Sequence, residues 1–231
     1  MSASVSAWCV PSVLRGRLSG VQFIDEAVSA YMRKLCDRYD EPVLLEMEKL
    51  AEDRNFPIVG RVVGVTLELL ARSIRARRVF EMGSGFGFSA YWFARAVGET
   101  GEVYLTDTEA GNAEQAEDFL TRARLWDRCH FLVQDAVGAL AAAEGEFDIV
   151  YNDIDKEGYP DAWDLARTKI GPGGLYLCDN VLWSGRVAQD DDQSPATVAI
   201  RAHNEAVYAD PDFIATIVPT RDGVMTALRL R

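Results

Sequence analysis

The stretch that decides the fold is Val79-Phe80-Glu81-Met82-Gly83-Ser84-Gly85-Phe86-Gly87-Phe88-Ser89. A short apolar run reaches an acid and is followed by three glycines at alternate positions, which is typical of a buried strand that ends abruptly. The glycines allow a tight turn and the close approach of a ligand. Residues 89–97 are expected to form a helix whose amino end points at the same place. The stretch therefore predicts a strand, a ligand-binding loop and a helix.

The acid in this loop indicates which ligand it binds. Glu81 would repel a pyrophosphate, whereas its carboxylate could hold a cationic amino group. This favours S-adenosylmethionine, which carries an amino group and a sulfonium, over a dinucleotide. The alternative is an ordinary strand-to-helix turn of a doubly wound protein, because glycines at this spacing also occur in plain turns.

Strands and helices alternate beyond this loop. The patterns predict strands at 79–82, 103–106, 130–133, 147–152, 174–178, 213–219 and 224–230, and helices at 89–97, 112–123, 136–143, 159–169 and 195–209. Thr220-Arg221-Asp222-Gly223 joins the last two strands, and Asp-Gly between apolar runs is a strong hairpin signal. Repeated strand–helix units imply a parallel sheet with helices on both faces and one antiparallel edge. We expect a single domain over residues 1–231.

The segment before the loop is predicted to be helical. Residues 23–52 show two amphipathic helices divided at Glu41-Pro42, where the proline suits a first helical turn. Residues 62–74 show helical spacing again, after Phe56-Pro57-Ile58-Val59-Gly60 breaks the pattern. We expect residues 1–55 to pack on or over the ligand site.

Composition excludes several classes of function. The net charge of −12 is not offset by any basic cluster, so no nucleic-acid substrate is expected. No apolar run approaches the roughly 20 residues of a membrane span, and residues 1–20 lack the pattern of a signal peptide. The four cysteines form no C-x-x-C pair and the two histidines have no partner at ligand spacing. These features favour reduced thiols in a cytoplasmic protein and argue against a histidine-built zinc site.

Acidic residues follow several predicted strands, at the edge where ligands bind in such sheets. Asp107 ends the second strand and is placed to accept both hydroxyls of a ribose. Asp135, after the third strand, could accept from an adenine amino group or cap the helix that follows. Its position alone favours neither interpretation.

The fourth and fifth strands end in Asn152-Asp153 and in Asp179-Asn180. Asp153, Asp179 and Asn180 offer two carboxylates and an amide oxygen, which suit Mg²⁺, Mn²⁺ or Ca²⁺ and are poor ligands for zinc. From chemistry alone, a capping or turn role explains the Asp-Asn pair equally well. Lys156 is either a surface lysine or, beside a cation and a sulfonium, a base.

With these motifs the chain resembles, from about residue 56 to 231, the cation-dependent O-methyltransferases related to catechol and caffeoyl-coenzyme A O-methyltransferases. The resemblance rests on residues 81–89 and on Asp153-Ile154-Asp155-Lys156-Glu157-Gly158-Tyr159, Gly171-Pro172-Gly173-Gly174-Leu175 and Asp179-Asn180-Val181-Leu182-Trp183-Ser184-Gly185-Arg186-Val187. It implies a Rossmann-like, doubly wound, mostly parallel seven-stranded sheet with an antiparallel C-terminal hairpin and extra N-terminal helices. It also implies a homodimer.

The resemblance assigns roles to individual residues. Lys156 matches the catalytic lysine, with Asp153 beside it, and Val59 falls in the loop over the methionine end of the cofactor. The implied metal ligands are Asp153, Asp179 and Asn180. The residues implied to line the cofactor are Val59, Glu81, Gly83, Ser84, Gly85, Ser89, Asp107, Asp135, Ala136, Asp153 and Asp155.

The chain departs from the family pattern in three places. Asn152 stands where an aliphatic residue is usual, residues 56–59 replace a more polar segment, and residues 1–22 have no counterpart. Trp183 could form the wall of an aromatic acceptor site or simply pack in the protein. The run Asp190-Asp191-Asp192 is interpreted as a solvated loop.

We therefore expect an enzyme that moves a methyl group from S-adenosylmethionine to one hydroxyl of a small vicinal diphenol. Magnesium or a similar cation would hold both acceptor oxygens. The alternatives are a metal-independent methyltransferase acting on nitrogen or a carboxylate, and a non-catalytic S-adenosylmethionine-binding protein. A nucleotide-dependent oxidoreductase is disfavoured by Glu81.

Overall fold

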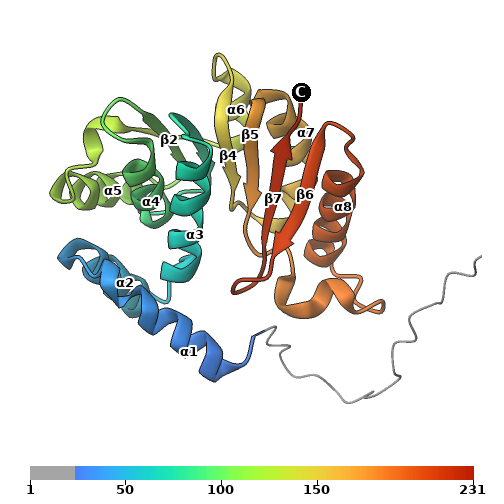
Figure 1. The fold of residues 1–231 in the computed structure, drawn as a ribbon, viewed down its shortest axis with the longest axis horizontal. Helices are drawn as coiled ribbons and strands as arrows, with labels where there is room; N and C mark the ends of the chain where they lie inside the picture. The colour runs from blue at the N-terminus through green and yellow to red at the C-terminus, as the bar shows by residue number, and fades with distance from the viewer. Residues whose placement is uncertain (1–23) are drawn as a thin grey trace, which may run out of the picture.

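The computed structural model describes residues 24–231, and its strands form one sheet in the order β3-β2-β1-β4-β5-β7-β6 (Figure 1). The strands are β1 (Arg78–Met82), β2 (Glu102–Asp107), β3 (Cys129–Val133), β4 (Phe147–Asn152), β5 (Ile170–Cys178), β6 (Phe213–Val218) and β7 (Val224–Arg229). The first five run parallel, and β7 pairs antiparallel with both β5 and β6. The predicted seven-stranded mixed sheet is confirmed, with β7 inside it and β6 at its edge.

Helices cover both faces of the sheet because successive strand residues face opposite sides. On β1, Val79 belongs to one buried core and Phe80 to the other. The first core is closed by α2 (Pro42–Arg54), α3 (Gly60–Ser73), α4 (Phe88–Val97) and α5 (Ala110–Arg122). The second is closed by α6 (Ala136–Ala142), α7 (Tyr159–Lys169) and α8 (Pro195–Ala209). The carboxyl ends of the parallel strands remain at one edge between the two layers.

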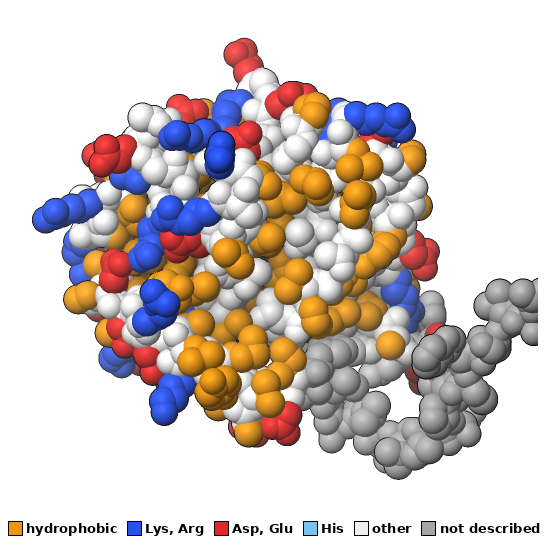
Figure 2. Space-filling model, viewed as in Figure 1, with side chains coloured by type: hydrophobic (Ala, Val, Ile, Leu, Met, Phe, Trp, Pro, Cys, Tyr) orange, Lys and Arg blue, Asp and Glu red, His pale blue; other side chains and the backbone are white. Residues whose placement is uncertain are grey.

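The first N-terminal helix is shorter than predicted. This helix, α1 (Glu26–Leu35), passes into a 3₁₀ turn, η1 (Cys36–Tyr39), before α2 begins at Pro42. Asp25 fixes the start of α1, since its carboxylate accepts a hydrogen bond from the Ala27 amide at 2.8 Å. No residue of α1 is buried, and its apolar side chains gather on the surface (Figure 2). This helix is held less firmly than the helices that cover the sheet.

Among the strands, the largest boundary difference lies at the start of β5, which begins at Ile170 rather than at residue 174. Ile170 pairs with Phe147, and Leu175 then pairs with Ile149 after a shift in register. The Gly-Pro-Gly-Gly stretch between them absorbs the irregularity, whereas such a stretch taken alone predicts a turn. Within residues 24–231, no helix is long and apolar enough to cross a membrane.

Candidate functional site

The glycine loop after β1 is fixed to the strands on both sides. The Gly83 amide donates to the Thr106 hydroxyl on β2 at 3.1 Å, and the Ser84 amide donates to the Thr106 carbonyl at 2.8 Å. On the other side, a Cβ on Gly83 would lie 2.6 Å from the Asp153 carbonyl oxygen, and its φ is +83°. Only glycine fits both conditions. The loop therefore lies directly against the residue that follows β4.

Glu81 lies at the base of this loop and is fully buried. Neither of its carboxylate oxygens has a hydrogen-bond partner within residues 24–231. Burial raises the pKa of Glu81 to about 8, although the nearby Ser89 and Ser84 side chains oppose the shift. An unpaired buried carboxylate is costly, so this position is suited to a ligand that brings a cation or a hydrogen-bond donor.

The other predicted cofactor residues lie around the same loop. Gly85 has φ +50° and approaches the Phe56 ring so closely that a Cβ there would be 2.9 Å from it. This contact places the segment before α3, which contains Val59, on the loop. Ser89 is buried in the first turn of α4.

Asp107 and Asp135 follow the neighbouring strands β2 and β3. Asp107 is half-buried, and its Oδ1 accepts from the Glu109 amide at 2.8 Å. Asp135 is the N-cap of α6, where its Oδ2 accepts from the Gly138 amide at 2.7 Å and Ala136 begins the helix. The structure thus gives Asp135 the capping role that its position left open. Its ligand role stays a prediction, as does that of Asp107.

A second cluster follows β4 and β5 and is centred on Lys156. The Lys156 ammonium donates to Asp153 Oδ1 at 3.2 Å and to Asn180 Oδ1 at 2.9 Å. It also donates to the Tyr159 hydroxyl at 2.7 Å, which donates in turn to the Asp179 carbonyl at 2.8 Å. Only 15% of the Lys156 side chain is exposed. The structure therefore brings together the predicted base and two predicted metal ligands.

Asp179 is the third predicted ligand and is almost fully buried. Its Oδ1 has no hydrogen-bond partner among the described residues. Burial and the charge of Asp153 raise the pKa of Asp179 to about 7. Burial also raises the pKa of Asp153, against the opposing charge of Lys156.

These residues fit a divalent cation. Asp153 and Asn180 each direct an oxygen at one positive nitrogen, and Asp179 holds an unsatisfied buried oxygen. Hard oxygen donors of this kind suit Mg²⁺. Residues 24–231 contain no group of three acidic, histidine or cysteine side chains arranged for a metal. The amide of Asn180 is therefore needed to complete the set.

Asp155, by contrast, lies outside this cluster. It is exposed, precedes the 3₁₀ turn η3 (Lys156–Gly158), and its side chain makes no hydrogen bond within the described residues. Its predicted cofactor contact stays a prediction.

Asn152, the unusual residue before Asp153, is buried in a polar network. Its Nδ2 donates to the Tyr176 hydroxyl at 3.2 Å, and that hydroxyl lies 2.9 Å from Nε2 of His203. Burial lowers the pKa of His203 to about 4, so the ring is neutral at pH 7. The network explains how a polar side chain is accommodated at the end of β4. Sequence reasoning missed His203 because its partners lie on other elements.

The hairpin turn between β6 and β7 also reaches the site. Its backbone holds the segment after Asn180, since the Val181 amide donates to the Gly223 carbonyl at 3.1 Å and the Leu182 amide to the Asp222 carbonyl at 2.9 Å. Arg221 crosses to the segment before α3 and donates to the Ile58 carbonyl. The Asp-Gly signal identified the hairpin, but nothing in the sequence pattern indicated these contacts.

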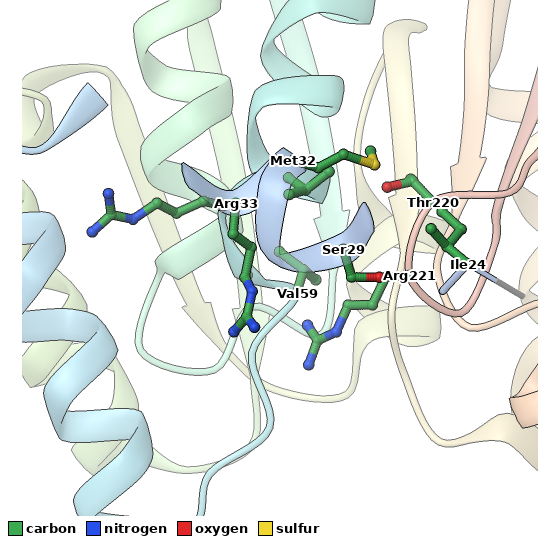
Figure 3. Close-up of a pocket in the computed structure, with 10 residues that line it drawn as sticks. Ile24, Ser29, Met32, Arg33, Val59, Thr220 and Arg221 are labelled. Carbon is green, nitrogen blue, oxygen red and sulfur yellow. The ribbon is translucent and has the colours of Figure 1, made fainter. Parts of the chain in front are cut away.

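A pocket of about 310 Å³ opens beside this turn (Figure 3). Its lining comes from α1 with Ile24 before it, from the start of α3 with the residue before it, and from the hairpin turn: Ile24, Ser29, Met32, Arg33, Val59, Gly60, Arg61, Val62, Thr220 and Arg221. The predicted Val59 is thus part of a cavity, together with several residues that sequence reasoning did not identify.

Trp183 and the acidic run lie after the metal motif, in η4 (Trp183–Ala188) and beyond. Trp183 is half-buried with the Arg186 guanidinium 5.5 Å from its ring centre. Asp190 and Asp191 are exposed, as a solvated loop predicts. Asp192 is different: it pairs with Arg186 at 2.6 Å, which holds its pKa well below the usual range. The prediction of a wholly solvated run is therefore wrong for Asp192.

The chain is similar in sequence to known O-methyltransferases. The family model described as O-methyltransferase matches residues 36–230. A catechol O-methyltransferase from Mycobacterium tuberculosis is 33% identical over 78% of this chain and 83% of its own length. A catechol O-methyltransferase from Niastella koreensis is 29% identical over 84% of this chain and 90% of its own length.

Solved structures show the same similarity. An O-methyltransferase from Bacillus cereus in complex with SAH has a TM-score of 0.80 and 27% identity, covering 88% of this chain and 97% of that one. TomG, an O-methyltransferase from Streptomyces achromogenes in complex with SAM, has a TM-score of 0.81 and 26% identity, covering 89% of this chain and 96% of that one.

Proposed function

The chain belongs to the O-methyltransferase family, and we propose that it methylates one hydroxyl of a small vicinal diphenol with the help of a divalent cation. It is an S-adenosylmethionine-dependent enzyme, as its relatives and structural neighbours are. The choice of acceptor draws support from the relatives named catechol O-methyltransferase.

One observation carries the proposal of a cation and a base in the same place. The Lys156 ammonium lies within hydrogen-bond distance of both Asp153 and Asn180, and the neighbouring Asp179 retains an unpaired buried oxygen. These three ligands would hold the cation, which when bound lowers the pKa of a bound hydroxyl.

The remaining chemistry belongs to the chain's own residues. Glu81 supplies a buried carboxylate for the amino group of the methyl donor, and the glycine loop leaves room for it. The acceptor oxygen attacks the methyl carbon in line, the bond from that carbon to sulfur breaks, and S-adenosylhomocysteine leaves. Lys156, which loses a proton to solvent when the cation and the sulfonium are bound beside it, is then a neutral amine whose Nζ receives the hydroxyl proton. No covalent bond to the enzyme forms.

Metal dependence of turnover tests this proposal. We expect a chelator to abolish methylation of a vicinal diphenol, and Mg²⁺ or Mn²⁺ to restore it. Asp153→Ala and Asp179→Ala should each reduce activity more than Asn180→Ala, because each removes a charged ligand. A mass-spectrometric assay of the methylated product measures the effect of the chelator and the activity of the three variants.

The same contacts also favour a second candidate, a metal-independent methyltransferase acting on nitrogen or a carboxylate. Lys156 already pairs with Asp153 in this structure, so the lysine can serve as the partner of that carboxylate in place of a metal. Full activity after exhaustive chelation would establish that candidate. Cofactor binding without turnover on any diphenol would instead favour a non-catalytic binding protein.

We further propose that the enzyme is cytoplasmic and works as a homodimer. An apolar stripe on α1, formed by Val28, Tyr31 and Leu35, supports the dimer because it stays exposed at 47–62%. Light scattering should give a mass twice that of one chain, and the Tyr31→Glu variant should have the mass of a single chain.

A further inference from the structure

The pocket beside the hairpin turn is lined by three arginines in a chain that carries a net charge of −12. Arg61 is fully occupied, since it binds Glu48 through two hydrogen bonds of 2.6 and 2.7 Å and also pairs with Asp40. Arg33 and Arg221 pair with no carboxylate within residues 24–231. Two guanidinium groups that form no ion pair among the described residues therefore line one small cavity of a molecule with negative net charge.

The same cavity contains a polar group without a partner. Thr220 is 5% exposed, and its Oγ1 is buried with no hydrogen-bond partner among the described residues. In Figure 3 this oxygen points toward Met32, across the pocket. A buried hydroxyl that is left unpaired costs free energy. It is a second and independent sign of a polar ligand in the cavity.

The cavity adjoins the cluster where methyl transfer is proposed. Asp222, next to Arg221 in the hairpin turn, accepts from the Ser184 amide at 2.6 Å, and its carbonyl accepts from Leu182. Gly223, at the end of the same turn, accepts at 3.1 Å from the amide of Val181, which follows Asn180. Val59, which also lines the pocket, belongs to the segment packed on the glycine loop. An acceptor held at the cluster would extend naturally into this pocket.

We propose that the methyl acceptor carries a carboxylate, which Arg33 and Arg221 bind in this pocket while the diphenol ring lies at the Asp153 cluster. The proposal rests on the function proposed above and specifies its substrate class. Guanidinium groups bind a carboxylate through paired hydrogen bonds. A volume of about 310 Å³ is at the lower limit for ligand pockets. It suits a short carboxylate side chain better than a large phosphorylated group.

The two arginines play different parts in this site. Arg221 also holds the Ile58 carbonyl, so its loss would disturb the wall of the pocket as well as its charge. The Arg33 side chain donates no hydrogen bond within residues 24–231 and lies exposed on α1. Arg33→Gln therefore tests charge recognition with little disturbance of the fold.

The experiment compares a vicinal diphenol bearing a propenoate side chain with its methyl ester. The wild-type enzyme should prefer the acid in kcat/KM. Arg33→Gln should lower the acid-to-ester ratio about 10-fold, and Arg221→Gln about 10- to 100-fold, as expected for the loss of charge-assisted hydrogen bonds. The loss should appear in KM, and Arg33→Lys should retain most of the preference. Lys34→Gln is the matched control, because Lys34 is an exposed neighbour on α1 outside the pocket lining.

An acid-to-ester ratio that is equal in wild type and both arginine variants would overturn the assignment. A second result would also overturn it, in favour of a phosphate ligand. In that case the wild-type enzyme shows no preference for the acid, and inorganic phosphate inhibits the wild type but not Arg33→Gln.

If neither diphenol is methylated, the proposed function fails but the anion site is still tested. Calorimetry with cinnamate, which carries the carboxylate and no hydroxyl, should show binding to wild type. That binding should be lost in Arg33→Gln and retained in Lys34→Gln. Absence of cinnamate binding to the wild-type protein would overturn the proposal.

Discussion

Glu81 on β1 and Asp153 after β4 lie on paired neighbouring strands, yet only Asp153 has a cation beside it. The Glu81 carboxylate is buried and unpaired, whereas Asp153 contacts the Lys156 ammonium at 3.2 Å. The edge of the sheet where ligands are expected to bind therefore has two halves. The Glu81 half depends on positive charge brought by a ligand, whereas the Asp153 half has the Lys156 ammonium as its own cation. We expect the two halves to respond differently to mutation, to pH and to ligands.

The largest difference between the two halves should appear when the Lys156 ammonium is removed. Lys156→Ala should lower kcat by roughly 10²- to 10⁴-fold, the range for a positioned acid–base group, while cofactor affinity stays nearly unchanged. Arginine should not restore activity because it stays protonated at any usable pH. Steady-state kinetics with diphenols of graded acidity provide the measurement, and the loss should shrink as the hydroxyl becomes more acidic. Near-normal turnover, independent of acceptor acidity, would leave Lys156 without a catalytic role.

The unpaired half should respond to pH through Glu81. Its pKa rises from 4.5 to about 8 on folding, so the folded chain holds the proton more tightly than the unfolded chain. The stability linked to Glu81 is complete below pH 4.5 and is lost as pH rises toward 8. At about 1.36 kcal/mol per pKa unit, the loss is on the order of a few kcal/mol.

Glu81→Gln removes this titration. Urea unfolding of the ligand-free protein should show a flatter dependence on pH between 4.5 and 8, while S-adenosylmethionine affinity falls. Asp179 titrates in the same direction and remains in the variant, so the slope should shrink rather than vanish. A slope equal to that of the wild type would show that Glu81 is not buried as described.

The network behind β4 and β5 should show the opposite dependence on pH. The pKa of His203 falls from 6.5 to about 4 on folding, so the unfolded chain binds the proton more tightly. The stability linked to neutral His203 is present above pH 6.5 and is lost as pH falls through 4, by up to about 3 kcal/mol. His203→Gln should remove that loss in unfolding curves recorded from about pH 7 to pH 4. Tyr208→Gln, an exposed position on the same helix, is the control.

The smallest expected effect concerns the ribose. Asp107→Ala should weaken S-adenosylmethionine binding by about 1–3 kcal/mol, because charge-assisted hydrogen bonds are lost. Isothermal calorimetry measures this, with Glu109→Ala as an adjacent acidic control. Unchanged affinity in a folded Asp107→Ala protein would exclude Asp107 from the cofactor site.

Much of this molecule could be predicted from local patterns. The order of strands and helices follows from periodicity. The rule that ligands bind at the carboxyl ends of parallel strands is enough to select Asp107, Asp153 and Asp179 as candidate site residues. These predictions are possible because each depends on residues close together in the chain.

The features that sequence reasoning missed depend on distant residues. Arg221 meets Ile58 across 163 positions. Asn152 is recognisable in the sequence as a polar residue at the end of an apolar strand, but its partner Tyr176, and His203 beyond Tyr176, lie on other elements. Such pairs are set by how helices pack on the sheet, which no local spacing specifies.

The contact between Gly83 and Asp153 also bears on how the chain folds. These residues are 70 positions apart, and β1 pairs first in sequence with β2 and only later with β4. The junction between the two halves of the site can close only after this long loop has formed, at an entropic cost that local contacts do not offset. We therefore expect competence to bind ligand to appear late in refolding, after most helical signal has recovered. Ligand-binding ability would then report completion of the sheet, rather than collapse of the chain.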